Sequence, residues 1–256
     1  MKLEEFSTGA AFVVGGTGGI GAAICRELAF SGANVAFTYR SKAEVAVALE
    51  AELKTLGVEA KAYKVDLLNT DTLNTVVESA ITSFGHLHSV VYASGPPLEY
   101  LYINEITPTE WARVINGDVN ACFNLIHATL PHFRSRRAGA YVAITTAAVD
   151  HAPPRDILSA APKAAIEMLV KGVAREEGRN NIRANCVRPG LIFAGLGLST
   201  MHEGTQDYVD RMIKAVPLRR AGQAEDIAGS TVFLLSAKAN YVSGVSIAVA
   251  GGLQLV

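Results

Sequence analysis

The stretch AAFVVGGTGGIGAAICREL, residues 10–28, decides the fold. Its first five residues form a continuous apolar run, which is typical of a strand buried inside a parallel sheet. A glycine-rich turn at 15–21 follows, and apolar side chains then recur at helical spacing up to Gly32. Glycines let the backbone approach a pyrophosphate, whose charge is stabilised at a helix N-terminus. Strand, glycine turn and helix in this order predict a dinucleotide-binding site at the head of a Rossmann fold.

The rest of the chain repeats this alternation of short apolar runs and longer helical patterns. The further expected strands are 34–40, 60–67, 88–95, 140–147, 182–190 and 246–252. No repeat or linker interrupts the order, so we predict one α/β domain over residues 1–256, a doubly wound parallel sheet with helices on both faces. Residues 191–216, apolar and rich in small residues, are expected to form a lid over the substrate within this domain.

Composition excludes several classes of function. The 256 residues carry a net charge of −1 and no long basic tract, which argues against a nucleic-acid partner. No apolar run is long enough to span a membrane and no signal peptide is visible, so the sequence predicts a cytoplasmic protein. The three cysteines are far apart, and no pattern of metal ligands is present. We therefore expect no metal and no membrane partner.

The end of the second expected strand selects the cofactor. An NAD site would place an acidic side chain there to bind the ribose hydroxyls. The sequence instead has Tyr39, Arg40, Ser41 and Lys42. A guanidinium beside a hydroxyl and an ammonium suits the 2′-phosphate of NADP(H), which is the cofactor that we predict. A solvated basic turn is the alternative interpretation.

Further motifs resemble those of the classical short-chain dehydrogenase/reductase family, and in style those of the bacterial 3-oxoacyl-carrier-protein reductases. In chain order they are GGTGGIG (15–21), VDL (65–67), ASG (93–95), DVN (118–120), RPG (188–190) and PLRRAGQAEDIA (217–228). The series spans the chain, and this combination is highly specific for the fold. The resemblance implies a nicotinamide cofactor, a small-molecule substrate and a homo-oligomer, either a tetramer or a dimer.

The resemblance also implies roles for individual residues. Asp66 and Leu67 would lie beside the adenine, Lys163 would bind the nicotinamide ribose, and Asn120 would hold a water molecule of the proton relay. The full set of implied cofactor contacts is Gly15, Thr17, Gly18, Gly19, Ile20, Gly21, Tyr39, Arg40, Ser41, Asp66, Leu67, Ala93, Ser94, Gly95, Lys163, Pro189, Gly190 and Ile192.

The chain departs from the family pattern where the proton donor is expected. The family motif is Tyr-x-x-x-Lys, but SAAPK at 159–163 places Ser159 in the tyrosine position. Thr146 stands where the catalytic serine is usual, and it keeps a hydroxyl. A serine hydroxyl is a far weaker acid than a phenol, so another acid is needed. Asp156, seven residues before Lys163, is the candidate, although an Asp before a helix is often an N-cap.

Three functions remain open on these residues. The first is an NADP(H)-dependent reductase with an altered proton relay, acting on a carbonyl or an iminium carbon of a small hydrophobic substrate. Its expected catalytic residues are Lys163, Asn120, Asp156, Thr146 and Ser159. The second is an NADP(H)-binding protein with little or no activity, a sensor or partner subunit. The third is a carbonyl reductase disabled by the serine.

Overall fold

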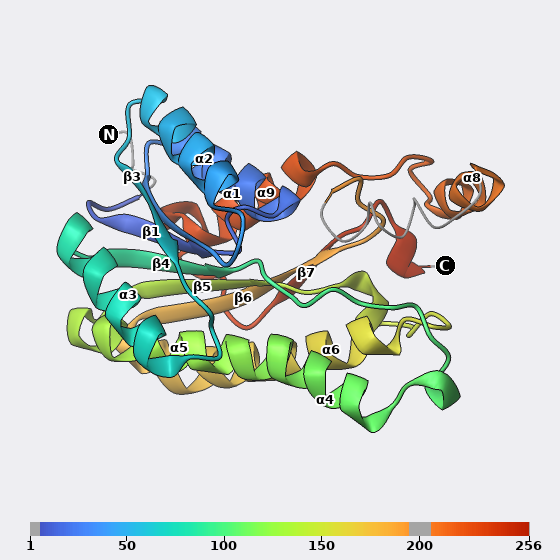
Figure 1. Ribbon diagram of the computed structural model, residues 1–256. Helices are drawn as coiled ribbons and strands as arrows, with labels where there is room; N and C mark the ends of the chain where they lie inside the picture. Colours follow the sequence, from blue (N-terminus) through green and yellow to red (C-terminus); the bar gives the residue numbers. More distant parts are fainter. Residues whose placement is uncertain (1–5, 195–205, 256) are drawn as a thin grey trace.

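The protein forms one seven-stranded parallel sheet with helices on both faces (Figure 1), as the sequence predicts. The computed structural model describes residues 6–194 and 206–255. The strand order is β3-β2-β1-β4-β5-β6-β7, so the order reverses between β1 and β4. The strands are β1 (Ala10–Val14), β2 (Asn34–Tyr39), β3 (Ala60–Lys64), β4 (Leu87–Tyr92), β5 (Gly139–Ile144), β6 (Ile182–Pro189) and β7 (Ser246–Val249).

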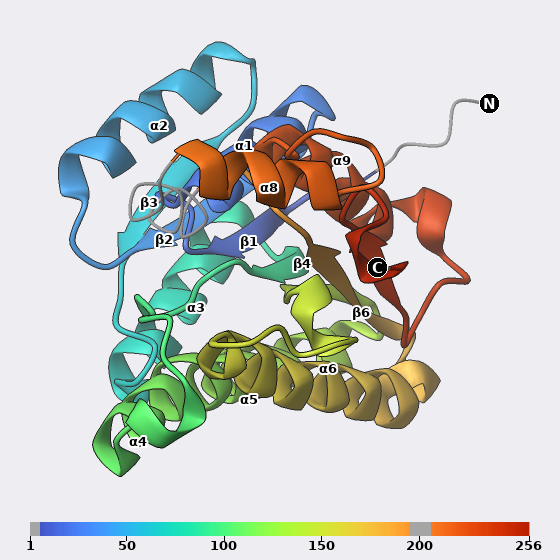
Figure 2. The ribbon, with the colours of Figure 1, turned by 90° about the vertical axis from the view of Figure 1, so that its right-hand side faces the viewer.

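Two groups of helices cover the sheet, as the two views in Figures 1 and 2 show. One face carries α1 (Gly19–Phe30), α2 (Ala43–Thr55) and α9 (Ala224–Leu235). The other carries α3 (Thr70–Phe84), α5 (Ala121–Arg136) and α6 (Ile157–Glu177). The remaining helical segments are η1 (Ile103–Glu105), α4 (Pro108–Ile115), η2 (Asn116–Asn120), η3 (Ala147–Val149), η4 (Gly178–Asn180), α8 (Gln206–Ala215), η5 (Ala237–Ala239) and η6 (Leu253–Leu255).

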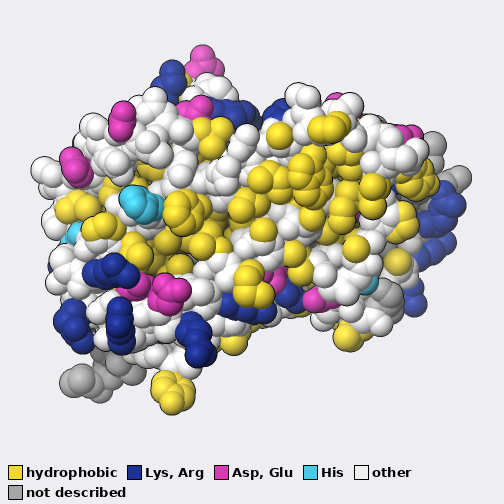
Figure 3. Space-filling view, turned by 90° about the horizontal axis from the view of Figure 1, so that it is seen from below, with side chains coloured by type: hydrophobic (Ala, Val, Ile, Leu, Met, Phe, Trp, Pro, Cys, Tyr) yellow, Lys and Arg dark blue, Asp and Glu magenta, His cyan; other side chains and the backbone are white. Residues whose placement is uncertain are grey.

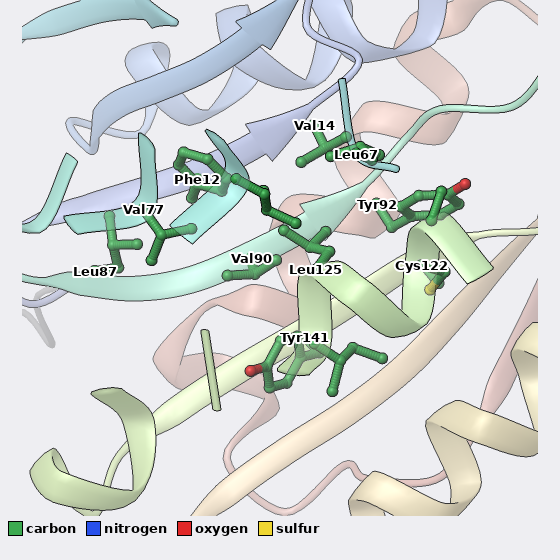
Figure 4. Packing of buried hydrophobic residues seen from close by; sticks show 14 of the residues in the cluster. Phe12, Val14, Leu67, Val77, Leu87, Val90, Tyr92, Cys122, Leu125 and Tyr141 are labelled. Carbon is green, nitrogen blue, oxygen red and sulfur yellow. The ribbon is translucent and has the colours of Figure 1, made fainter. Parts of the chain in front are cut away.

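The alternation of side chains along β1 explains why both faces need helices. Phe12 and Val14 point into the core under α3, α5 and α6, whereas Val13 points into the core under α1, α2 and α9. Figure 4 shows the first of these cores, in which Phe12 and Val14 lie near Val90 of β4 and Leu125 of α5. Burial on both sides makes β1 a rigid support for the turn that follows it.

Several sequence expectations need adjustment. Like the third strand, the strands expected at 88–95, 140–147 and 246–252 end three residues earlier, at Tyr92, Ile144 and Val249. The third strand ends at Lys64, so Asp66 and Leu67 lie in the loop after it rather than in the strand. Residues 195–205 of the predicted lid lie outside the described part of the chain; the rest comprises the residues that follow β6 and helix α8. The lid therefore stays a prediction.

Histidines at the start of β4, far from the carboxyl ends of the strands, make stability depend on pH. Burial lowers the pKa of His88 from 6.5 to about 4. Its Nδ1 lies 3.0 Å from Ser89 Oγ, and the Phe6 ring lies 5.3 Å from the His88 ring. The unfolded chain binds this proton more readily, so the stabilising contribution is complete above pH 6.5 and is lost as the pH falls towards 4.

We expect the free energy of unfolding to fall by about 2 kcal/mol from this group between pH 7.5 and pH 5. His88→Phe removes the titrating group and keeps a ring of similar shape. Urea unfolding at the two pH values should therefore show a smaller loss in His88→Phe than in the parent protein. Equal losses in the two proteins would assign the acid sensitivity to other groups.

Candidate functional site

The candidate site lies at the carboxyl ends of β1, β4, β5 and β6. In an open parallel sheet, a crevice forms where the strand order reverses, and here that point lies between β1 and β4. The glycine turn follows β1, residues 93–95 follow β4, and Thr146 and Pro189 stand at the ends of β5 and β6. The residues predicted from separate motifs are thus gathered along one edge of the sheet.

The glycine turn is shaped as a backbone cradle. Gly15 has φ +81°, and a Cβ at this position would lie 2.4 Å from the Ala93 carbonyl oxygen. A Cβ at Gly21 would lie 2.2 Å from the Gly15 oxygen, so no larger residue fits either position. Helix α1 begins at Gly19, and Gly18 before it supplies no side-chain cap. The first N–H groups of α1 are left for an anion, so the turn fits a pyrophosphate.

The adenosine end of the predicted site is partly exposed. Tyr39 ends β2 and is half-buried, while Arg40 and Ser41 are exposed in the turn before α2. Asp66 Oδ1 accepts the Leu68 N–H at 3.0 Å, and Leu67 is buried with its carbonyl bound to Asn124 Nδ2. The structure therefore leaves Arg40 and Ser41, the predicted 2′-phosphate contacts, exposed to solvent. Asp66 and Leu67, the predicted neighbours of the adenine, lie on the loop after β3. The remaining turn residues, Thr17 and Ile20, are half-buried.

At the nicotinamide end of the predicted site, the end of β6 and the residues after it line the crevice. The Gly190 N–H donates to the Val249 carbonyl at 3.2 Å, and a Cβ on Gly190 would lie 2.7 Å from that of Ala250. Pro189 and Ile192 are buried, and Ile192 forms an isolated bridge with Gly222. These contacts hold the chain close to β7 before it reaches the lid region.

Helix α6 presents three predicted residues in a row. Asp156 precedes the helix, and Ser159 and Lys163 follow at three and seven positions further on, a spacing that puts them along one helical face. The Ser159 N–H donates to the Asp156 carbonyl oxygen at 3.0 Å. Lys163 reaches across to the loop after β4, where its Nζ donates to the Ser94 carbonyl at 3.3 Å.

The structure does not place the Asn120 side chain against Lys163, and its implied role of holding a water molecule stays a prediction. Asn120 is exposed, and its Nδ2 donates to Asn116 Oδ1 at 2.7 Å. Residues 116–120 form one turn of π-helix between α4 and α5, and such turns rotate the following residues around the axis. Asp118, rather than Asn120, points inward, and its Oδ1 lies 2.8 Å from Lys163 Nζ.

Asp118 was missed in the sequence, although a signal was present. A carboxylate between Gly117 and Val119, where a helix meets the core, is costly to bury unless it is paired. Its side chain is 4% exposed, and the Tyr92 hydroxyl lies 2.9 Å from Oδ1 and donates to it. Burial, reinforced by the negative charge of Asp118, raises the pKa of Tyr92, so the phenol remains a donor.

Asp156 has a different environment. It occupies the N-cap position of α6, but its side chain makes no capping hydrogen bond. Burial raises the pKa of its carboxyl from 3.8 to about 6, and no charged neighbour contributes to that shift. Within the described part of the chain no cation pairs with this half-buried carboxyl, and its pKa lies closer to neutral pH than that of an exposed Asp. The N-cap interpretation does not account for the side chain.

The hydroxyls near the end of β5 face different partners. Thr146 Oγ1 accepts the Ala148 N–H at 3.2 Å and begins η3. Thr145 is buried and donates to Glu167 Oε1 at 2.9 Å. Ser159 is half-buried and lies one turn before Lys163. Thr146 and Ser159 are therefore the two predicted hydroxyls that are not bonded into the Glu167 network.

A second ion-pair network, also missed in the sequence, connects the elements that carry the predicted site residues. Glu167 of α6 is 3% exposed and forms two hydrogen bonds with Arg188 of β6, one of them Nε to Oε1 at 2.7 Å. The same guanidinium donates to Asp150 at 2.6 Å, and Ser246 Oγ donates to Glu167 at 3.1 Å. The network joins α6, the end of β6 and the loop that leads to Asp156.

Within the described ranges, 6–194 and 206–255, no group of three or more His, Cys, Asp or Glu residues is arranged to hold a metal ion. In the same residues, no helix is long and apolar enough to cross a membrane.

Comparisons with known proteins agree with this architecture. A family model described as enoyl-(acyl carrier protein) reductase matches residues 14–254. The 3-oxoacyl-[acyl-carrier-protein] reductase FabG of Staphylococcus aureus (strain Mu50) is 32% identical over 256 residues, all of both chains. FabG of Chlamydia muridarum is 31% identical over 246 residues, 95% of this chain and 96% of that protein.

Solved structures give the same result. A short-chain type dehydrogenase/reductase from Mycobacterium ulcerans superposes with a TM-score of 0.91 at 28% identity, covering 98% of this chain and 91% of that one. An NAD⁺-bound xylitol dehydrogenase superposes with a TM-score of 0.90 at 26% identity, covering 95% and 98%. With a family model matching nearly its whole length, the chain belongs to the short-chain dehydrogenase/reductase family of oxidoreductases.

Proposed function

We propose that the protein is an NADP(H)-dependent reductase with an altered proton relay, which transfers hydride to a carbonyl or iminium carbon of a small, hydrophobic substrate. The observation that carries this proposal is Asp156. It is a half-buried carboxyl with a raised pKa and no ion-pair partner among residues 6–194 and 206–255, and it lies on the face of α6 that also presents Lys163. The glycine cradle and the loop at 93–95 support binding of the nicotinamide nucleotide.

The residues of the chain divide the chemistry between them. The nicotinamide supplies the hydride. Lys163, fixed by Ser94 and Asp118, is suited to bind ribose hydroxyls at the wall of the crevice. Thr146 orients the reacting group through its hydroxyl. Ser159 fills the tyrosine position as a hydrogen-bonding group and not as the acid, since an alcohol holds its proton too tightly.

Asp156 would act in one of two ways. In its protonated form it donates a proton to the oxygen of a carbonyl substrate as hydride arrives at carbon. In its ionised form it stabilises an iminium cation. Reduction of that cation needs hydride but no proton, because the nitrogen of a protonated imine already carries one. The two branches predict opposite dependence on pH, because the first needs the proton that the second excludes.

A matched substrate pair tests the proposal. NADPH oxidation is measured with 1-tetralone and with 3,4-dihydroisoquinoline, a ketone and an imine of the same bicyclic size. Saturable oxidation with either substrate supports a reductase, and the choice between them identifies the branch. NADPH that binds saturably but is oxidised by no ketone or imine would refute it and favour the second candidate.

That second candidate is an NADP(H)-binding protein with little or no activity. Ser159, in the position of the family tyrosine, is the observation in its favour. The partnerless Asp156 carboxyl argues against it, because a sensor has no need of a titratable group at this place.

The preference for NADP(H) over NAD(H) rests on the exposed Arg40 and Ser41 at the end of β2. We expect Arg40→Asp to weaken NADPH binding at least about tenfold, because a charge-assisted contact with the 2′-phosphate is replaced by repulsion. Binding of NADH serves as the control and should not weaken, because NADH has no such phosphate and an acidic side chain at this place suits its ribose hydroxyls. Equal losses for both cofactors would contradict the assignment.

The assembly and the location in the cell also remain proposals. Figure 3 shows hydrophobic side chains gathered over the face formed by α5 and α6, where Phe123 and Met168 are 51% and 66% exposed. An exposed apolar face of this kind supports the predicted homo-oligomer, a tetramer or a dimer. The predicted cytoplasmic location stays a prediction.

A further inference from the structure

The charge of the Lys163 ammonium is cancelled within the site. Asp118 Oδ1 lies 2.8 Å from Lys163 Nζ, and the side chains are 4% and 13% exposed. The Tyr92 hydroxyl donates to the same carboxylate, and the Lys163 Nζ lies 5.3 Å from the centre of the Tyr92 ring. A buried pair held by an additional hydrogen bond acts on its surroundings as a dipole rather than as a full positive charge.

The pair lies directly at the wall of the crevice. A Cβ at Gly95 would lie 3.7 Å from Lys163 Nζ and 3.8 Å from Asp118 Oδ1, so the loop at 93–95 lies within about a methyl group's reach of both charges. A ligand in the crevice therefore meets the lysine and its counter-ion together.

The other charged groups of the site do not restore a positive field. Arg188 is bound by two carboxylates, those of Glu167 and Asp150. Arg155 is exposed, and it donates to the Tyr100 carbonyl at 2.9 Å and lies 5.7 Å from the Tyr102 ring. Of the charged groups named here, Lys163, Arg188 and Arg155 stand against the carboxylates of Asp118, Glu167, Asp150 and Asp156. Arg155 is exposed and screened by solvent, and among the described residues Asp156 is the one of these four carboxylates without an ion-pair partner.

We infer that Asp118 is a specificity-determining residue: by neutralising Lys163 it leaves Asp156 as the uncompensated charge of the site, so the site selects a positively charged substrate, a protonated imine, over a neutral ketone. This inference rests on the proposed function and narrows its substrate class. The iminium carbon receives the hydride, the electron pair of the C=N π bond moves to nitrogen, and the cofactor leaves oxidised. No proton donor is required, which agrees with a serine at position 159.

The test uses binding, so that it does not depend on turnover. The NADPH-saturated protein is titrated at pH 7.5 with tetrahydroisoquinoline, a protonated cyclic amine, and with isochroman, its neutral oxygen isostere. We expect the amine to bind at least about tenfold more tightly, because one uncompensated charge in a partly buried site is worth more than about 1.4 kcal/mol. Asp156→Asn should abolish this preference.

Asp118→Asn gives the decisive comparison. The amide keeps the shape and an acceptor oxygen for Lys163, but it leaves the lysine charge uncompensated, so the preference for the amine should fall several-fold. Asp71→Asn, at the exposed start of α3, is the matched control and should keep the full preference. If Asp118→Asn does not fold, the double variant Asp118→Asn/Lys163→Met removes both charges of the pair. It should keep the preference for the amine, and loss of the preference in this variant overturns the inference.

Two results would overturn the inference: equal affinities for the two ligands in the parent protein, or a preference that survives unchanged in either Asp118→Asn or Asp156→Asn. These results are separable from failure of the proposed function. A preserved preference without NADPH oxidation would refute the reductase and leave the charge selection standing. Oxidation with the ketone and no preference for the amine would do the reverse.

Discussion

Asp156→Asn is expected to lower kcat for the preferred substrate roughly hundredfold or more, the usual contribution of a positioned acid, base or counter-charge. The amide is close in shape to the carboxyl but can neither lose a proton nor carry a negative charge. The side chain makes no hydrogen bond to the start of α6, so the fold should tolerate the change. NADPH oxidation under saturating substrate gives the ratio.

Three controls distinguish a loss of chemistry in Asp156→Asn from a loss of folding or of cofactor binding. The melting temperature of Asp156→Asn should be no lower than that of the parent protein, because the variant lacks a carboxylate that burial destabilises. The NADPH affinity should match that of the parent protein, since Asp156 lies outside the glycine cradle. Asp71→Asn should keep full activity. An unchanged kcat in Asp156→Asn would return this residue to a purely structural role at the start of α6.

Arg188→Met is expected to lower the free energy of unfolding by about 3–5 kcal/mol, because it leaves the buried Glu167 carboxylate without its cation. The bonds of Thr145 and Ser246 to Glu167 cannot replace a full positive charge. Unfolding in guanidinium chloride, with the slope checked for two-state behaviour, measures the loss. Because the network also joins the loop before Asp156, activity should fall as well.

The double variant Arg188→Met/Glu167→Met removes both charges, and it should recover much of the lost stability. Arg26→Met is the matched control: it breaks an ion pair whose side chains are 41% and 45% exposed, which should cost less than about 1 kcal/mol. A loss in Arg188→Met no larger than that of Arg26→Met would contradict the buried-network interpretation.

The sequence was sufficient for the fold because the relevant signals are local. The apolar run at 10–14, the glycine turn and the repeated alternation each act over a few residues, and together they admit one doubly wound topology. Glycines 15 and 21 could be identified because their close contacts arise within this local motif. The predicted fold class and the family are confirmed.

The charged partners in the site could not be predicted in the same way. Whether Asn120 or Asp118 faces Lys163 depends on one turn of π-helix, which changes the direction of the side chains without a distinct sequence pattern. The pairing of Glu167 with Arg188 joins residues 21 positions apart on different elements. Such contacts are set by the packing of α6 on β6, which spacing along the chain does not reveal.

The central claim is that a titratable carboxyl, Asp156, has taken over the chemistry at a site that lacks the family tyrosine. The most direct test is kcat/KM for NADPH-dependent reduction of 3,4-dihydroisoquinoline and 1-tetralone between pH 4.5 and pH 8.5, in the parent protein and in Asp156→Asn. We predict imine reduction whose rate rises as the pH increases through about 6, where Asp156 ionises, and no such inflection in Asp156→Asn. Saturable NADPH binding without oxidation at any pH, or a profile identical in the two proteins, would contradict the claim.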